Sequence, residues 1–169
     1  MGEWEAKVIL VTGAAGGIGK ATVKRFLENQ AVVFASDVNA AALNQSLSNM
    51  SVMRGTVHKI IGDVAKVADC ERIVATAVNG GGRLDVVVNS AGVWVEGPSD
   101  TMTEAMWDRT MDINLKGTFF INRYAIPELE KTRGAIVNIS SNDGLTGDPE
   151  AAIYCASKGG VCLMTKSLA

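Results

Sequence analysis

The sequence predicts an α/β protein with a three-layer, doubly wound parallel sheet. Short apolar runs rich in β-branched residues alternate with amphipathic helical segments along the whole chain. The runs are apolar at consecutive positions, which is typical of parallel strands that crossover helices bury on both faces. The chain has 169 residues and no internal repeat or linker, so we expect residues 1–169 to form a single domain.

The first half of the chain predicts three strands and three helices. The apolar runs place strands over three segments: 7–12, 31–36 and 57–61. A helix follows the glycine-rich turn after the first strand, with Ile18 on its apolar face. Two further helices are expected over residues 40–47 and 67–78, and the glycines at 80–82 indicate where the second of them ends.

The second half predicts three segments before the last helix: a strand from Leu84, a long helix over 103–130 and a strand over 135–140. Thr101 and Glu104 have the spacing of an N-terminal capping box, and Pro127 predicts a bend in the last turns of the long helix. After a polar loop, a final helix is expected from about Ala151 to the end of the chain.

Composition excludes several classes of function. The 16 basic and 18 acidic residues give a net charge of −2, so no basic surface for nucleic acid is expected. The apolar runs are far shorter than the roughly 18 residues that span a bilayer, so no membrane partner is expected. Three cysteines without a Cys-x-x-Cys pair predict no disulfide framework and no metal site. With no targeting segment visible, a reducing, cytoplasmic setting fits best.

The turn Thr12–Gly19 lies where the first strand meets the first helix, and a helix N-terminus offers free N–H groups to phosphate. In it, Gly13 permits the tight turn, Gly17 lets a pyrophosphate approach the backbone and Gly19 lets helix and strand pack closely. The Walker spacing of phosphate-loop hydrolases fails, because Ala14 and Ala21 stand where it needs a glycine and a hydroxyl. The turn therefore favours phosphate binding over a merely flexible connection, as is expected of a Rossmann-like dinucleotide-binding domain.

Asp37 ends the second strand, 18 positions beyond Gly19. A carboxylate there accepts hydrogen bonds from a ribose diol and repels a 2′-phosphate, so the sequence predicts NAD rather than NADP. No Lys or Arg at residues 14–16 or 38–41 would hold the extra phosphate. The alternative is that Asp37 caps the following helix, a role that Asn39 could serve equally well.

Tyr154 and Lys158 share one face of the last helix, because they lie four residues apart. An ammonium beside a phenol favours the phenolate, which makes Tyr154 a candidate general acid or base. Ser141 follows the carboxyl end of the preceding strand, where ligands of open sheets bind, and its hydroxyl is suited to a substrate carbonyl. The alternatives are a surface tyrosine with a solvated lysine, and a serine that only caps a loop.

Six groups of residues, in this order and spacing, resemble the short-chain dehydrogenase/reductase family of NAD(P)-dependent oxidoreductases: Thr12–Gly19, Asp63-Val64, Asn89–Gly92, Asn114, Ser141 and Tyr154–Lys158. The resemblance implies that Tyr154 is the general acid/base, that Lys158 favours its phenolate and holds the nicotinamide ribose, and that Ser141 orients the substrate. It also implies that Asn114 holds a proton-relaying water and that Asp63 contacts the adenine amino group. The cofactor-binding set so implied is Gly13, Gly17, Ile18, Gly19, Asp37, Asp63, Val64, Asn89, Ala91, Gly92, Tyr154 and Lys158.

The expected function is therefore that of an NAD-dependent short-chain dehydrogenase/reductase, which transfers a hydride between NAD(H) and a secondary alcohol or ketone. Ser90 departs from the family, which usually has asparagine there, and the chain ends soon after Lys158, without the family's last two strands and substrate-binding loop. With these C-terminal strands missing, 135–140 would become a sheet edge. The alternative function is that of a truncated, non-catalytic dinucleotide-binding module.

The resemblance also implies a homodimer or homotetramer that forms through the last two long helices. On the final helix, apolar surface would come from Val161, Met164 and Leu168.

Four large side chains after the fourth strand either line a substrate pocket or belong to the core: Trp94, Met102, Met106 and Trp107. Cys155 and Cys162 are expected to be small core residues. His58 is expected to be structural or to lie on the surface, because no other metal ligand is spaced near it.

Overall fold

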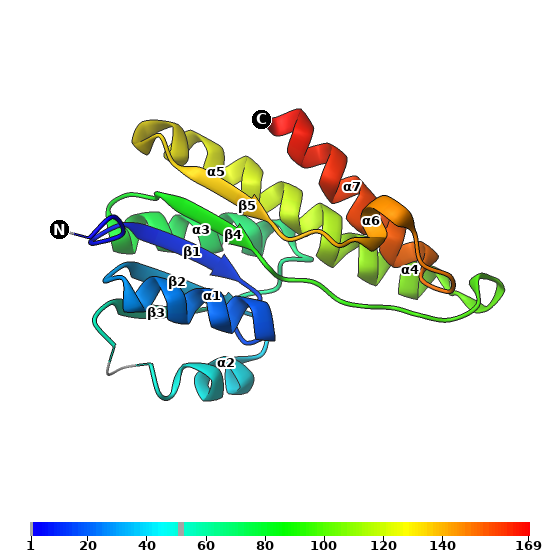
Figure 1. Cartoon of the computed structure of the whole chain (residues 1–169), viewed down its shortest axis with the longest axis horizontal. Helices are drawn as coiled ribbons and strands as arrows, with labels where there is room; N and C mark the ends of the chain where they lie inside the picture. The colour runs from blue at the N-terminus through cyan, green and yellow to red at the C-terminus, as the bar shows by residue number, and fades with distance from the viewer. Residues whose placement is uncertain (1, 51–52) are drawn as a thin grey trace.

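The computed structural model describes residues 2–50 and 53–169 and contains one five-stranded parallel sheet in the order β3-β2-β1-β4-β5 (Figure 1). The strands are β1 (Val8–Thr12), β2 (Val32–Asp37), β3 (Thr56–Ile61), β4 (Val86–Asn89) and β5 (Ala135–Asn138). Every pairing is parallel, so each connection crosses over the sheet. The predicted doubly wound, Rossmann-like fold is therefore confirmed.

Helices cover both faces of the sheet. They are α1 (Gly17–Glu28), α2 (Ala40–Leu47), α3 (Val67–Gly81), α4 (Glu104–Met111), α5 (Thr118–Thr132), α6 (Asp143–Thr146) and α7 (Ala152–Leu168). Along β1, Leu10 packs in a cluster with Ile73 of α3 and Ile121 of α5, and its neighbour Ile9 packs in another with Leu27 of α1 and Leu43 of α2. Consecutive strand residues are thus buried on opposite faces, which explains the uninterrupted apolar runs.

The chain reverses its direction of winding at β1. It proceeds outward through β2 and β3 and then returns to the other side through β4 and β5, so the carboxyl ends of β1 and β4 lie side by side with Thr12 opposite Asn89. Ligands of open α/β sheets bind outside the strand ends at such a switch point. The residues that follow β1 and β4 therefore define where a site is expected.

The long predicted helix is divided in two by one wide turn. A π-helical segment, Asp112–Gly117, connects α4 to α5, and α5 continues through Pro127 to Thr132. The predicted cap is wrong, because the hydroxyl of Thr103 accepts the bond from the Met106 N–H and Thr101 lies in a short 3-10 turn. Apolar periodicity does not reveal the extra residue of a π turn, which often occurs at functional sites.

Four other expectations need correction. Ile18 is 57% exposed at the start of α1, outside the core. The polar loop after β5 contains the short helix α6, and β5 itself ends at Asn138 rather than at residue 140. Val161, expected on the outer face of α7, is buried, because that face of the helix packs inward. Within the part of the chain that the structure describes, no helix is long and apolar enough to cross a membrane.

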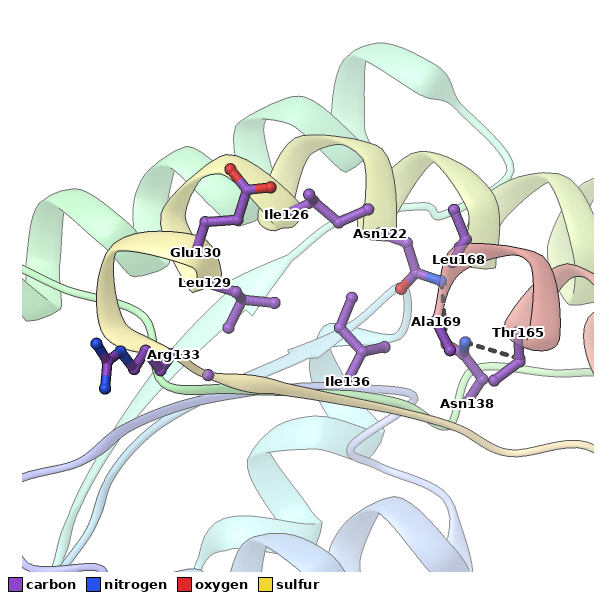
Figure 2. Close-up of a pocket in the computed structure, with 11 residues that line it drawn as sticks. Asn122, Ile126, Leu129, Glu130, Arg133, Ile136, Asn138, Thr165, Leu168 and Ala169 are labelled. Atoms are coloured by element: carbon purple, nitrogen blue, oxygen red, sulfur yellow. Dashed lines mark hydrogen bonds between the residues drawn. The ribbon is translucent and has the colours of Figure 1, made fainter.

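In the described part of the chain, β5 pairs only with β4 and forms an edge of the sheet. A groove of about 410 Å³ lies beside this edge, between α5 and the end of α7. Figure 2 shows Ile126 and Leu129 of α5 and Ile136 of β5 pointing into it, with a hydrogen bond from Asn138 to Thr165 at one end. This groove is separate from the switch point, because the two are lined by different residues.

Candidate active site

A second groove, which we call the switch-point groove, lies at the carboxyl ends of β1, β2 and β4. Its volume is about 140 Å³. The lining residues are Gly13, Ser36, Asp37, Val38, Gly62, Asp63, Val64, Ala91, Gly92, Val93 and Ile113. Six of the residues assigned to cofactor binding from the sequence therefore meet in one place, although they come from four separate segments of the chain.

The glycine-rich turn forms one wall of this region. Gly13 has a φ of +64°, and a Cβ there would lie 2.7 Å from the backbone of Ala91, so only glycine permits this close approach of the turns after β1 and β4. A Cβ on Gly19 would collide with the carbonyl oxygen of Gly13. At Gly17, by contrast, a Cβ meets nothing within 4 Å, and no side chain caps the start of α1 at Gly16. The backbone is open there, which suits an incoming anion.

Asp37 bridges the turns after β1 and β2. Its carboxylate accepts hydrogen bonds from the N–H of Ala15 at 3.0 Å and the N–H of Asn39 at 2.9 Å. The cap of α2 is Asn39, whose side chain accepts from the Ala42 N–H, so the capping alternative for Asp37 is wrong. Next to Asp37, Ser36 is buried, and its hydroxyl lacks a hydrogen-bond partner among the described residues. An orphaned polar atom beside this groove calls for a ligand or water.

Asp63 and Val64 follow β3 and line the switch-point groove. The carboxylate of Asp63 accepts from the Ala65 N–H, and its own N–H donates to Asp69, so the turn after β3 is fixed. Val64 is packed closely against the π turn, because a Cβ on Gly117 would lie 2.7 Å from the Val64 carbonyl oxygen. These contacts join the wall of the groove to the segment that carries Asn114.

Asn89 lies apart from the other predicted cofactor residues. Its side chain is buried and donates to the amide oxygens of Asn122 at 2.6 Å and Asn138 at 2.8 Å. It therefore ties β4 to α5 and β5 beneath the site. It does not line the switch-point groove, which the chain after β4 lines with Ala91, Gly92 and Val93.

Asn114 is buried within the π turn and holds the segment that leaves β4. Its amide oxygen accepts from the Val93 N–H at 2.8 Å, while its amide nitrogen donates to the Val93 carbonyl at 2.9 Å and to the Ser157 hydroxyl at 3.0 Å. Ser157 in turn donates to the Tyr154 carbonyl. One side chain thus joins the chain after β4 to the helix that carries Tyr154 and Lys158.

Lys158 extends along α7 toward the same point. It is 6% exposed, its Nζ donates to the Ile139 carbonyl at 2.8 Å, and that Nζ lies 5.7 Å from the centre of the Tyr154 ring. Burial lowers the pKa of Lys158. Gly92 separates this ammonium from Asn114, since a Cβ at residue 92 would lie 3.3 Å from the Asn114 Oδ1 and 3.5 Å from the Lys158 Nζ. The cation therefore borders the switch-point groove.

Ser141 lies in the turn that leads from β5 to α6. Its hydroxyl accepts from the Asp143 N–H at 3.2 Å. The turn rests directly on α7, because Gly144 approaches so closely that a Cβ would lie 2.6 Å from the backbone of Lys158. Neighbouring Ser140 also donates to the Lys158 carbonyl. Ser141 is consequently held against the helix of Tyr154 and Lys158.

Trp94 stands beside Tyr154. The two ring centroids are 4.4 Å apart at 58°, and Trp94 is 48% exposed. Of the other large residues after β4, Trp107 is also exposed, and Met102 and Met106 are only half-buried. The expectation that these four residues belong to the core is therefore wrong. Cys155 and Cys162 are half-buried too, and His58 lies on the surface, stacked on Phe34.

Sequence reasoning missed three residues that build this site. Ser36 carries the orphaned hydroxyl, Ser157 links Asn114 to α7, and Gly144 permits the contact of α6 with α7. Only Ser157 had a signal, because it lies one helical turn from Tyr154 on the buried side of α7. Across residues 2–50 and 53–169, no cluster of three or more acidic, His or Cys side chains is arranged to hold a metal ion.

The chain resembles known oxidoreductases along its whole length. The family described as short chain dehydrogenase matches residues 7–169. An uncharacterized oxidoreductase of Thermotoga maritima is 39% identical over 167 residues, with 98% of this chain and 66% of the relative covered. The meso-2,3-butanediol dehydrogenase of Serratia marcescens is 34% identical, with 98% of this chain and 65% of the relative covered.

A solved structure of NAD+-bound xylitol dehydrogenase superposes with a TM-score of 0.94 at 28% identity, over 99% of this chain and 65% of that one. The chain thus spans about two thirds of the length of the relatives that it matches.

Proposed function

Because the chain belongs to the short-chain dehydrogenase family, whose members here include alcohol dehydrogenases, we propose that it is an NAD-dependent oxidoreductase acting on a secondary alcohol or ketone. One observation carries the proposal. Asn114 and Lys158 flank Gly92 at the mouth of the switch-point groove, and Tyr154 lies beside the Lys158 ammonium. A proton-transferring phenol is thereby next to a groove with the chemistry of a dinucleotide site.

The residues present fit a dinucleotide. The open backbone at Gly17 suits the pyrophosphate, while the buried, unpartnered hydroxyl of Ser36 and the carboxylate of Asp37 suit ribose hydroxyls. Asp63 and Val64 would hold the adenine, and Lys158 the nicotinamide ribose. A bound nicotinamide supplies or accepts the hydride.

The protein's own residues move the proton and orient the substrate. In oxidation, Tyr154 takes the hydroxyl proton of the alcohol, and in reduction it returns a proton to the carbonyl oxygen. The Lys158 ammonium lies 5.7 Å from the centre of the Tyr154 ring. Ser141 donates a hydrogen bond to the substrate oxygen, and Asn114 holds the water through which protons reach Lys158.

We propose NAD rather than NADP as the cofactor, because a 2′-phosphate would meet the carboxylate of Asp37 without a compensating cation. In the described segments, the uncharged Val38 and Asn39 follow Asp37, and the N–H of Ala15 donates to its carboxylate. Calorimetric titration should give a lower Kd for NAD than for NADP, and Asp37→Ala should narrow the difference. Tighter binding of NADP would overturn this assignment.

Turnover tests the reaction itself. NADH formation from a panel of secondary alcohols should fall about 10²- to 10⁴-fold in Tyr154→Phe, the typical contribution of general acid/base catalysis, with NAD affinity unchanged. Tyr124→Phe is the matched control, because that phenol lies on α5 away from the groove. If the chain binds NAD but turns over no alcohol, the second candidate, a non-catalytic dinucleotide-binding module, is favoured. The position of β5 at the edge of the described sheet is the observation in its support.

We also propose self-association through the outer face of the long helices. A groove of about 420 Å³ there is lined by Met111, Leu115, Phe119, Gly160 and Met164, together with Asp112 and Lys116. Phe119 is 40% exposed within it. A second copy that covered this face would bury apolar surface, which is the main favourable term in association. Light scattering should therefore detect a dimer or tetramer, and a stable monomer at micromolar concentration would contradict this.

A further inference from the structure

An exposed aromatic face borders the proposed proton-transferring residue. Trp94 is 48% exposed, although tryptophan is highly buried on average, and its ring centre lies 4.4 Å from that of Tyr154. Tyr154 itself is half-buried. The indole of Trp94 thus contacts the phenol of Tyr154 on one side, and the rest of the apolar indole surface is exposed to solvent beside it.

The position of Trp94 is fixed from both sides. The preceding residue, Val93, has its N–H and its carbonyl bonded to the single side chain of Asn114. The indole Nε1 donates to the Glu96 carboxylate at 3.0 Å, so the polar edge of the ring is already occupied. What remains free is an apolar ring surface on a backbone that the site itself holds in place.

This arrangement restricts the group that a substrate can carry. An oxygen that reaches the Tyr154 hydroxyl brings a substituent of its carbon next to Trp94, because the two rings are in contact. A flat, apolar substituent gains offset or edge-to-face contact with the indole. A carboxylate or phosphate there would lie near the Glu96 carboxylate and be repelled.

We propose that Trp94 is a specificity-determining residue, which selects neutral secondary alcohols and ketones that bear a planar apolar group next to the reacting carbon. The inference rests on the proposed function, because it takes Tyr154 as the group that meets the substrate oxygen. Trp94 acts here by contact with the substituent, and Asn114 and Glu96 act as positioning residues for it.

The test compares a planar with an open-chain ketone on matched variants. Acetophenone and 2-butanone are titrated into the wild type, Trp94→Ala, Trp94→Phe and Trp107→Ala, with and without NADH, and binding is followed by ligand-observed NMR. Trp107 is the control, because it is also 48% exposed but lines a different groove, with Thr103 and Ile153, and makes no ring contact with Tyr154 in the described structure. Circular dichroism and NAD affinity verify that each variant is folded.

We expect Trp94→Ala to weaken acetophenone binding about 3- to 10-fold, the range of an aromatic pair, and 2-butanone binding less than about twofold. Trp94→Phe should restore most of the preference, and Trp107→Ala should leave both constants unchanged. Equal losses for both ketones, the same loss in Trp107→Ala, or no acetophenone binding by the wild type would overturn the proposal. Failure to form NADH from any alcohol would instead count against the proposed reaction, because ketone binding is read without turnover.

Discussion

Replacing Gly17 with alanine should separate phosphate binding from folding in the glycine-rich turn. A Cβ at Gly17 meets no heavy atom within 4 Å, and the residue begins α1 without a positive φ. Alanine in place of glycine in a helix stabilises by up to about 1 kcal/mol. In a chain of this length that corresponds to an increase in Tm of roughly 1–4 °C.

The same methyl group should weaken cofactor binding, because it projects into the open space where a pyrophosphate would approach the helix. A hydrogen bond from a backbone N–H to a charged phosphate oxygen contributes about 1.5–3 kcal/mol. Loss of one such bond raises the Kd for NAD about 10- to 150-fold. Differential scanning calorimetry and calorimetric titration with NAD measure the two effects on the same sample.

Gly19→Ala provides the comparison. Its Cβ would collide with the Gly13 carbonyl oxygen, so this variant should lose both Tm and NAD affinity. Opposite changes in Gly17→Ala, with Tm up and affinity down, would show that residue 17 acts on the ligand alone. If Gly17→Ala binds NAD as tightly as the wild type, the pyrophosphate does not lie at this turn and the reasoning is refuted.

Three further outcomes follow from charge and exposure. Burial raises the pKa of Asp85, but hydrogen bonds from Arg83, the Val8 N–H and Lys7 outweigh it, and the pKa lies below its ordinary value. Asp85→Asn should therefore lose about 2–4 kcal/mol of unfolding free energy at pH 7. A carboxyl group whose pKa is lower in the folded than in the unfolded state stabilises the folded protein at pH values above its unfolded-state pKa. The stability difference between wild type and Asp85→Asn, measured by urea titration, should therefore disappear as the pH falls through the folded-state pKa of Asp85. A difference that does not depend on pH would contradict this. Burial also lowers the pKa of Lys158, so the folded protein loses this proton at a lower pH than the unfolded chain does. The unfolding free energy of the wild type, relative to that of Lys158→Met, should therefore rise from pH 7 toward pH 10.5. Equal slopes of unfolding free energy against pH for the two proteins would argue against this. Val137, 46% exposed on edge strand β5, should promote self-association, so Val137→Lys should reduce light scattering at equal concentration and Val137→Thr should not.

The parallel sheet and the alternation of its strands with helices could be predicted, because each segment shows its own residue pattern. Parallel strands buried on both faces are apolar at every position, and Leu10 and Ile9 show this directly by packing into opposite clusters. The end of a strand depends on its neighbour. β5 stops at Asn138 because that residue pairs with Asn89, the last residue of β4. The cap of α4 was misplaced because both Thr101 and Thr103 precede the helix, and only the backbone geometry distinguishes them.

The sequence names candidate site residues but does not reveal how their side chains are connected. Asn114 could be named from the resemblance, yet its bonds to Val93 depend on a π turn that leaves no trace in hydrophobic periodicity. Asn89 could be named in the same way, but its burial against Asn122 and Asn138 depends on how α5 packs on β4 and β5. Ser36 carried no signal, because a serine in a strand is identified as unpartnered only when all its neighbours are known.

The π turn explains how an irregular segment can carry a defined site. Val93 follows a strand and has no strand partner, and buried or half-buried peptide groups without partners are costly. The Asn114 amide supplies one acceptor and one donor, which satisfies both the N–H and the carbonyl of Val93. From this wide turn, the Asn114 side chain contacts Val93 and Ser157 together. Asn114 thus links the residue before Trp94 to the helix that carries Tyr154, and the two rings lie 4.4 Å apart where these segments meet.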